Sequence, residues 1–415
     1  MMNDNHRHRR YLILNLIKRF GPVSRTELTE LTDLRAATVG EITKELLEEE
    51  LIVHSGYVSH GHGRRRTMLQ INNTRICAIG ISITTACVTT VVAQLDGTIL
   101  SQAEDPIVPA ESRAALEERI AGRIALLLDE FGERKIVGIG IGDQLYDPLL
   151  YPRSGSLMSI YAHFNDWVHL NLKPRLERVS ALPTQTFSPV ILPALAQMRF
   201  GAAKDVRDFL CVELSNGIGA SICTNGCVVA GAAGVAGELG HTLIDLESDA
   251  RMCYCGRPGC VEMTTAFPAL VEQINAALER GVFSSLQSVH GRPRQITPRD
   301  IRRALDEGDQ MCRYYVKRAA MRLGAAIANA VNLLNPSLVV LYGFMLEMGE
   351  FFLEQLCAAI RENVLSLAGN FTIRTSSMLE SMLPLGAAAE MFNEFLRLDE
   401  YQWVYRLGPM EPRQT

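Results

Sequence analysis

The 415-residue chain contains no uncharged apolar run of about 18 or more residues, so the sequence does not predict a membrane-spanning helix. Its N-terminus starts with basic residues, but Asn15, Lys18 and Arg19 interrupt the apolar stretch that follows. No small-residue cleavage site comes after it, so a secretory signal peptide is not expected. We therefore expect the protein to stay in the cytoplasm.

Low-complexity tracts are also absent, and the 10 cysteines do not indicate a disulfide framework, because thiols stay reduced in the cytoplasm. Seven cysteines are scattered singly and are typical of small buried hydrophobic residues. The other three, Cys253, Cys255 and Cys260, form a cluster that needs its own explanation. The length favours two or three compact domains.

The formal net charge of −5 is unevenly distributed. Residues 1–72 carry 11 Lys and Arg against 9 Asp and Glu, whereas the rest of the chain carries 30 against 37. The basic residues of the first segment occur in two clusters, Arg7–Arg9–Arg10 and Arg64–Arg65–Arg66. Such clusters are typical of a surface that contacts phosphate groups.

The N-terminal segment has the pattern of a helical module. Residues 9–20 place apolar side chains close to one helical face, and Gly21-Pro22 ends that helix. Ser24 and Glu27 form a capping-box pattern that predicts a short second helix through about residue 31. A brief turn then leads to a third helix, expected over about 35–49 with Val39, Ile42, Leu46 and Leu47 facing inward.

Two short helices with a tight turn after a scaffold helix predict a helix-turn-helix, whose last helix would enter the major groove of double-stranded DNA. The segments 51–53 and 68–71 look like two strands of a β-wing with an Arg-rich tip. The candidate DNA-binding residues are Arg35, Ala36, Thr38, Gly40 and Thr43 on the helix and Arg64, Arg65 and Arg66 on the wing. Glu41 also lies among the outward residues expected for this helix.

Two other interpretations of this segment remain open. A three-helix module could bind a protein instead of DNA, although the arginines of the wing count against that use. The stretch His60-Gly61-His62-Gly63 could bind a metal ion, but two histidines without neighbouring Cys or carboxylate ligands make a poor site.

From about residue 75 the pattern changes to strand pairs that alternate with amphipathic helices. Apolar, β-branched segments occur at 77–100, 135–145, 209–231 and 336–345, and helices are expected at 113–131, 168–178 and 311–334. This alternation predicts an α/β architecture with mixed sheets.

Specific motifs in this region resemble those of the ROK family, named for repressors, open reading frames and sugar kinases. They are AGELGHT at 236–242, MCYCGRPGCVE at 252–262, SNGIGASICTNG at 215–226, similar to the second phosphate loop of the family, and LNPSLVVLYG at 334–343. With the helix-turn-helix in front, the resemblance covers nearly the whole chain. It implies a two-lobed actin-like, ribonuclease H-like sugar-kinase domain and the transcriptional-regulator branch of the family.

The cysteine cluster has the spacing of a structural zinc site. Thiolates in a Cys-x-Cys-x4-Cys arrangement, with a histidine twelve residues upstream, supply three sulfurs and one nitrogen, a closed tetrahedral set. Gly256 and Gly259 permit the tight turns, and the resemblance implies His241, Cys253, Cys255 and Cys260 as ligands. The interval from His241 to Cys253 suggests an enlarged loop at 245–251. Reduced cysteines without a metal are the alternative.

The positions that carry kinase chemistry in the family are altered. Counting back from Gly201, the Asn-Asp pair that holds the catalytic base is replaced by Ser188 and Pro189, and proline cannot accept a proton. The first phosphate loop, usually Asp-x-Gly-x-Thr, is replaced by 82–85, without the acid and the glycine. A displaced base at Asp143 or Asp147 is the remaining route to catalysis. A lone aspartate in a loop is far more often simply solvated, so we expect no enzyme activity.

Sugar binding is a separate question. Glu238, His241 and Glu262 match the sugar-hydroxyl contacts of the family, and carboxylates with an imidazole suit recognition of vicinal hydroxyls. Alternatively, Glu238 and His241 serve only to build the metal loop. The missing Asn-Asp pair would remove two sugar contacts, which favours a weak or unusual ligand.

Together these features predict a regulator, most simply a repressor, of carbohydrate-utilisation genes. It would bind a palindromic operator as a homodimer or higher oligomer and respond to a sugar or sugar phosphate. Expected domains are a winged helix-turn-helix at 1–72, a first lobe at 73–195 with a returning helix at about 384–397, and a second lobe at 196–383 with the zinc site. The alternatives are a sugar kinase with an accessory domain and a regulator controlled by a protein partner.

Overall fold

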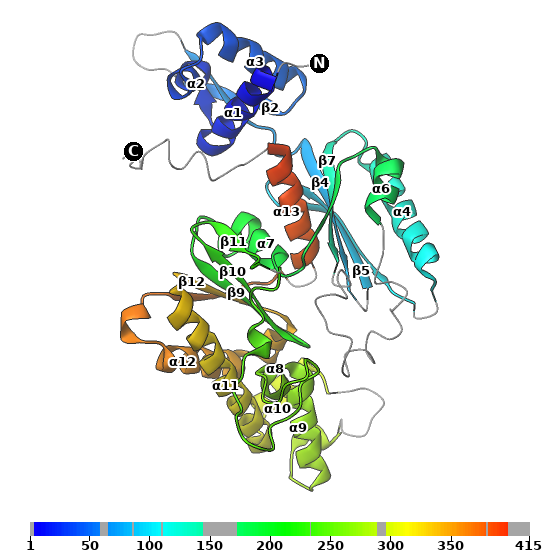
Figure 1. Ribbon diagram of the computed structural model, residues 1–415, viewed down its shortest axis with the longest axis vertical. Helices are drawn as coiled ribbons and strands as arrows, with labels where there is room; N and C mark the ends of the chain where they lie inside the picture. Colours follow the sequence, from blue (N-terminus) through cyan, green and yellow to red (C-terminus); the bar gives the residue numbers. More distant parts are fainter. Residues whose placement is uncertain are drawn as a thin grey trace.

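The computed structural model describes residues 4–58, 65–84, 87–108, 111–143, 172–232, 234–288, 296–378 and 381–396. These residues form an elongated molecule with a small helical head at one end and two α/β lobes below it (Figure 1). None of the described helices combines the length and the apolar character needed to cross a membrane.

The head contains three helices and a three-stranded sheet of order β1-β3-β2. Its elements are α1 (Asp4–Phe20), β1 (Val23–Ser24), α2 (Arg25–Thr32), α3 (Ala36–Glu48), β2 (Ile52–Val58) and β3 (Arg66–Ile71). The predicted capping box is present: Ser24 accepts a hydrogen bond from the backbone of Glu27, whose carboxylate accepts one from the backbone of Ser24. The helix α2 ends at Asp33, whose positive φ of 54° turns the chain into α3.

Lobe 1 is built on a five-stranded sheet of order β6-β5-β4-β7-β8. Its strands are β4 (Ile76–Ile83), β5 (Cys87–Gln94), β6 (Ile99–Pro106), β7 (Lys135–Asp143) and β8 (Thr184–Phe187). The alternating side chains of β4 divide between two cores: one face packs on α4 (Arg113–Glu130) and α6 (Leu172–Ser180), and the other on α13 (Met382–Leu396). The expected helix at 113–131 is confirmed, and the expected helix at 168–178 is described from residue 172 onward.

Lobe 2 is built on a second five-stranded sheet, of order β11-β10-β9-β12-β13. Its strands are β9 (Phe209–Leu214), β10 (Ile218–Thr224), β11 (Cys227–Val229), β12 (Leu338–Tyr342) and β13 (Thr372–Thr375), and its helices are α8 (Glu262–Thr265), α9 (Phe267–Glu279), α10 (Pro298–Asp306), α11 (Gln310–Leu334) and α12 (Glu350–Asn363). The expected helix at 311–334 is confirmed as α11. Asp309 caps its first turn, and Asn335 ends it in a left-handed conformation directly before Pro336.

The helix α13 returns from lobe 2 and packs between the lobe 1 sheet and α7 (Leu192–Phe200). Glycines allow backbone to meet backbone there: a Cβ on Gly80 of β4 would lie 1.8 Å from the Pro384 carbonyl oxygen, and one on Gly140 of β7 would lie 2.3 Å from that of Ala387. Because α7 also contacts β9 and β10, α7 and α13 join the two lobes.

Gly80→Ala should therefore lower the free energy of unfolding by about 3 kcal/mol, since the added methyl group meets rigid backbone. Gly122→Ala is the matched control, because Gly122 is exposed within α4 and its added Cβ meets no atom within 4 Å. In a helix interior the control should stabilise by about 0.5–1 kcal/mol. Urea unfolding of both variants measures the difference, and equal stabilities would contradict the close packing of α13.

The head is attached to lobe 1 through the end of α13, which reaches up to it (Figure 1). Asn15 of α1 donates a hydrogen bond from Nδ2 to the Leu396 carbonyl oxygen at 2.8 Å. Ile13 and Ile17 of the head belong to the same continuous core as Phe392 and Leu396. The last turn of α13 is thus a packed junction between the lobes and the head.

Candidate functional site

The predicted metal ligands are brought together by the structure. The ligand atoms of His241, Cys253, Cys255 and Cys260 all lie within 4.8 Å of one another. Nδ1 of His241 is 3.6 Å from Sγ of Cys253, and Sγ of Cys255 is 3.5 Å from Sγ of Cys260. The four residues therefore form one cluster that can hold a metal ion.

The loop that carries the cysteines depends on two glycines in the left-handed region of φ. Gly256 has φ +85° and Gly259 has φ +82°. A Cβ on Gly259 would lie 1.8 Å from the Asp245 carbonyl oxygen, so the loop at 245–251 packs directly on this turn. Gly256 donates its backbone N–H to the Cys253 carbonyl, which closes the turn between the first two thiols. The turns within the sequence motif thus bring its three thiols together.

The three thiols would have to lose their protons to bind a metal ion. Burial raises the pKa of the Cys260 thiol to about 12 and also raises the pKa of Cys253. Burial acts in the same direction on Cys255, but hydrogen bonds, first that from the Arg257 backbone, bring its pKa below the usual value. A bound cation would stabilise all three as thiolates, which is how such a set binds metal.

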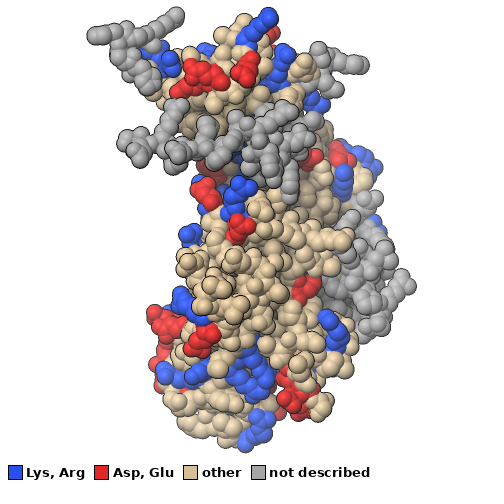
Figure 2. All heavy atoms as spheres, turned by 60° about the vertical axis from the view of Figure 1, so that its left-hand side comes forward, with Lys and Arg blue, Asp and Glu red and all other residues tan. Residues whose placement is uncertain are grey.

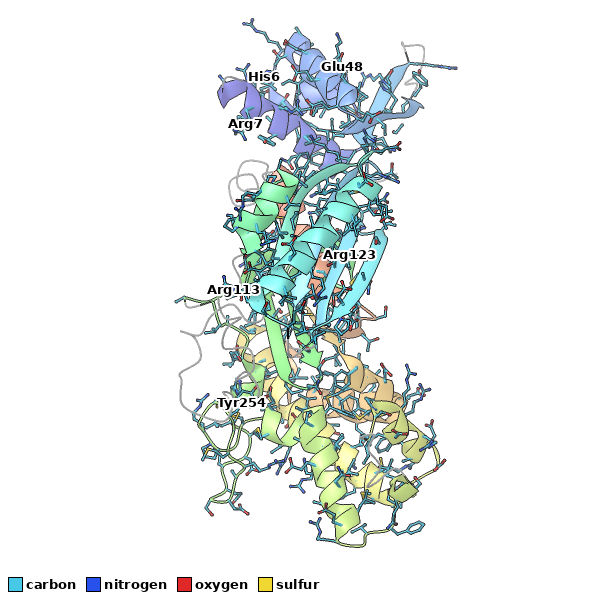
Figure 3. All side chains as sticks on the ribbon, turned by 90° about the vertical axis from the view of Figure 1, so that its right-hand side faces the viewer. His6, Arg7, Glu48, Arg113, Arg123 and Tyr254 are labelled. Atoms are coloured by element: carbon cyan, nitrogen blue, oxygen red, sulfur yellow. The ribbon has the colours of Figure 1, made fainter. Side chains whose placement is uncertain are left out.

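Of the three predicted sugar-contact residues, His241 belongs to this cluster, and Glu238 and Glu262 lie beside it. Oε2 of Glu238 is 3.7 Å from Nε2 of His241, while Oε2 of the buried Glu262 accepts a hydrogen bond from the Ile218 backbone at 3.0 Å. His241 therefore faces the thiols with Nδ1 and Glu238 with Nε2. Tyr254 of the cysteine loop, labelled in Figure 3, meets the His241 ring edge-on with ring centroids 5.1 Å apart.

The positions expected to have lost kinase chemistry carry no ionisable side chain. Ser188 and Pro189 lie in the turn between β8 and α7, where the Ser188 carbonyl accepts a hydrogen bond from the Ile191 backbone. Ser82 is buried in β4. Asp143, one of the two candidate displaced bases, is the last residue of β7, and its backbone pairs with Ile83 of β4. The other, Asp147, lies outside the described residues, as do Thr85 and residues 60–63.

Four of the five α3 residues predicted to face outward are exposed or partly exposed. Arg35 and Ala36 are exposed, and Thr38 and Gly40 are partly exposed. The expectation that Thr43 faces outward is wrong: Thr43 is buried and accepts a hydrogen bond from Nε of Arg25 at 2.7 Å. Its hydroxyl fixes α3 against α2, so it is not available to DNA.

The basic cluster near the N-terminus also has a structural use that the sequence did not reveal. Arg10 donates hydrogen bonds to both carboxylate oxygens of Glu49, and this interaction raises the pKa of Arg10. His6, labelled with Arg7 in Figure 3, lies 3.1 Å from Glu45. Charges of both signs accordingly lie side by side on the head (Figure 2). Arg10 ties α1 to α3 and is not a free phosphate contact.

The wing adds a residue that sequence analysis missed. Arg65 is exposed, Arg66 pairs with Val58 across the hairpin, and Arg64 lies outside the described residues. Tyr57 is 71% exposed at a β-bulge where Gly56 has φ +111°. Bulges redirect side chains. In the sequence, the available signal was a tyrosine directly after a glycine within a short strand.

Comparisons with known proteins match nearly the whole chain. The family model described as "ROK family" matches residues 78–393. The Xylose repressor of Caldicellulosiruptor bescii is 29% identical over 396 residues, which cover 94% of this chain and 96% of the relative. The DNA-binding transcriptional dual regulator NagC of Escherichia coli K12 is 27% identical over 380 residues, 91% of this chain and 90% of the relative.

A solved structure confirms the predicted two-lobed α/β fold. It is described as a ROK family transcriptional regulator, homologue of the E. coli MLC protein, and it superimposes with a TM-score of 0.77 at 24% identity. The match covers 95% of this chain and 98% of the other, so the head is included together with both lobes.

Proposed function

The chain belongs to the ROK family, and we propose that it is a sugar-responsive transcriptional repressor of carbohydrate-utilisation genes. The observation that carries the proposal is the near full-length likeness to regulators named for xylose and to NagC, with the head included. Family kinases need a carboxylate where this chain has Pro189, so we propose that the two-lobed domain binds a ligand and does not phosphorylate it.

We assign the head as a winged helix-turn-helix that binds double-stranded DNA. Its three helices and hairpin have the element order of such a module. The α3 surface of Arg35, Ala36, Thr38 and Gly40 would enter the major groove, and Arg64, Arg65, Arg66 and Tyr57 of the wing would contact the neighbouring backbone. A palindromic operator implies a homodimer, because half-site symmetry mirrors protein symmetry. A regulator of chromosomal genes would act in the cytoplasm.

We further propose that the cluster of His241, Cys253, Cys255 and Cys260 holds a structural zinc ion. Three sulfurs and one nitrogen leave no open coordination position, so the ion would stabilise the loop and take no part in chemistry. The loop would hold His241 beside Glu238, and with Glu262 these side chains would bind the hydroxyl groups of a sugar.

The junction at α13 supplies a route from ligand to DNA. A sugar bound between the lobes changes their relative arrangement only if it binds one arrangement more tightly. Because α13 packs on α7 and lobe 1 and its Leu396 carbonyl accepts a hydrogen bond from Asn15, a shift of α13 would reposition α1 and the rest of the head.

The proposal predicts which genomic DNA the protein retains. Fragmented DNA from the source organism, incubated with purified protein at moderate salt and sequenced, should be enriched in a palindromic site beside sugar transport or metabolism genes. Arg35, Arg65 and Arg66 changed together to Ala should abolish the enrichment, since phosphate contacts dominate affinity for DNA.

Replacing Arg299, Arg302 and Arg303 of α10 by Ala is the matched control. It removes the same charge from side chains that are exposed on lobe 2, and it should leave enrichment intact. Equal retention by the head variant would contradict DNA binding through this surface. Transfer of phosphate from ATP to a hexose by the wild-type protein would instead revive the kinase alternative.

A further inference from the structure

One acid on the outer side of α3 has no part in the function proposed above. The helix lies at the end of the head away from the two lobes (Figure 1). Ala37, Glu41 and Lys44 are exposed on it, and their spacing of four and three residues places them in one row along the helix. Glu41 therefore lies in the middle of the face that would enter the major groove.

The surface around Glu41 permits close approach of a partner. Ala36 and Ala37 are exposed, and Gly40 lies within the helix although a Cβ there would meet no atom within 4 Å. A glycine inside a helix is less favourable than an alanine, and no contact within the described part of the chain requires one at this position. The missing side chain leaves room beside Glu41 for the edge of a base pair.

Glu41 also differs from the other acids of α3 in its lack of a cationic partner. Glu45 lies 3.1 Å from His6, and Glu48, labelled in Figure 3, lies 3.7 Å from Lys44. Among the residues that the structure describes, the side chain of Glu41 forms no ion pair and no hydrogen bond. A carboxylate close to DNA is repelled by the phosphates, so Glu41 weakens binding unless the DNA offers it a hydrogen-bond donor.

The chemistry of the base edges decides which donor suits this side chain. An ionised carboxylate only accepts hydrogen bonds. In the major groove, guanine presents two acceptors, thymine an acceptor and a methyl group, and adenine a donor beside an acceptor. Cytosine presents a donor, its N4 amino group, without an acceptor of its own. A carboxylate therefore pairs best with cytosine, and the acceptors of the other bases repel it.

We propose that Glu41 determines operator specificity by accepting a hydrogen bond from N4 of one cytosine in each half-site. The inference rests on the proposed DNA-binding function and specifies one base of the operator. Arg35 is exposed at the start of the same helix and contributes affinity through its positive charge. Glu41 contributes discrimination, because it lowers the affinity for every sequence that lacks the cytosine.

Selection of sites from a library of random DNA duplexes by the full-length protein tests this inference. The wild type should retain sites with cytosine at one position of each half-site, preferred about tenfold over the other bases. Glu41→Gln replaces the carboxylate by an amide, which pairs with adenine, so the preferred base at that position should change from cytosine to adenine. Glu41→Ala should lose most of the preference there and keep the rest of the site.

Glu48→Gln is the matched control. It removes the same charge from the last turn of α3, whereas base edges are contacted by residues near the start of a reading helix, so the selected site should not change. If both Glu41 variants select the same site as the wild type, or if the base that they alter is not a cytosine, the inference is overturned and DNA binding stands. If the wild type selects no sequence, the DNA-binding function is refuted, and this inference with it.

Discussion

Thr38→Glu should lower affinity for the isolated operator by about 100-fold or more at constant salt, with the fold unchanged. Thr38 lies in the first turn of α3 on its accessible side, where a side chain would face base edges or phosphates. A wrong contact costs about 1–3 kcal/mol in each half-site, and a dimer binds two half-sites. A new negative charge against the DNA backbone adds to this cost.

The same substitution should not destabilise the head, which makes the result interpretable. A carboxylate in the first turn of a helix interacts favourably with the helix dipole, and Thr38 has no hydrogen bond between side chains that would be lost within the described residues. Fluorescence anisotropy gives the operator affinity, and thermal unfolding gives the stability. Asn73→Glu introduces the same charge at an exposed position after β3 and should change affinity less than about twofold.

An unchanged operator affinity for Thr38→Glu would mean that α3 is not the reading helix. A loss of affinity accompanied by a fall in melting temperature would mean that Thr38 is structural, as Thr43 proved to be. The two threonines are therefore a useful pair: Thr43 is buried against Arg25, and its replacement should act through stability.

Local signals in the sequence were sufficient to find the three helices of the head, but they did not predict β1, the first turns of α1 or the full length of β2. The Ser24 and Glu27 pair set the start of α2, and helical periodicity identified Val39, Ile42 and Leu46 as core residues, all of which are fully buried. Thr43 was misassigned because it lies at the edge of this apolar stripe. A polar residue there looks solvent-facing until the position of α2 is known.

Pairings across long sequence separations could not be predicted. Arg10 and Glu49 lie 39 residues apart, and Asn15 and Leu396 lie 381 residues apart. A single sequence has no periodic pattern that reveals either pairing. Arg10 was therefore interpreted as a phosphate contact, and the packing of α13 against the head was not predicted.

The cluster of His241 and the three cysteines was predictable because the sequence spacing of its thiols is that of a metal-ligand set. Cys253, Cys255 and Cys260 are close in sequence, and the turns between them need only Gly256 and Gly259. The distant ligand, His241, came from the family resemblance. Its two-sided position, with thiols on one side and Glu238 on the other, emerged only from the structure.

Cys253→Ser should abolish stoichiometric zinc binding and lower the melting temperature of lobe 2 by about 10 °C. Removal of a metal ligand typically costs more than about 4 kcal/mol, and one kcal/mol corresponds to about 2–4 °C in a domain of this size. Metal analysis of the purified protein and thermal unfolding measure the two effects. Cys227→Ser, at a partly exposed thiol of β11 outside the cluster, should change neither.

Loss of the ion should also weaken sugar binding, although the ion would not touch the sugar. If Nδ1 of His241 held the metal, the imidazole proton would sit on Nε2, which lies 3.7 Å from Oε2 of Glu238, and both side chains would be oriented for a ligand. Glu238→Gln should then lose sugar affinity and keep its zinc, whereas Cys253→Ser should lose both. Full zinc occupancy in Cys253→Ser would refute the ligand set. Unchanged sugar affinity in a zinc-free Cys253→Ser protein would separate the metal from the sugar site.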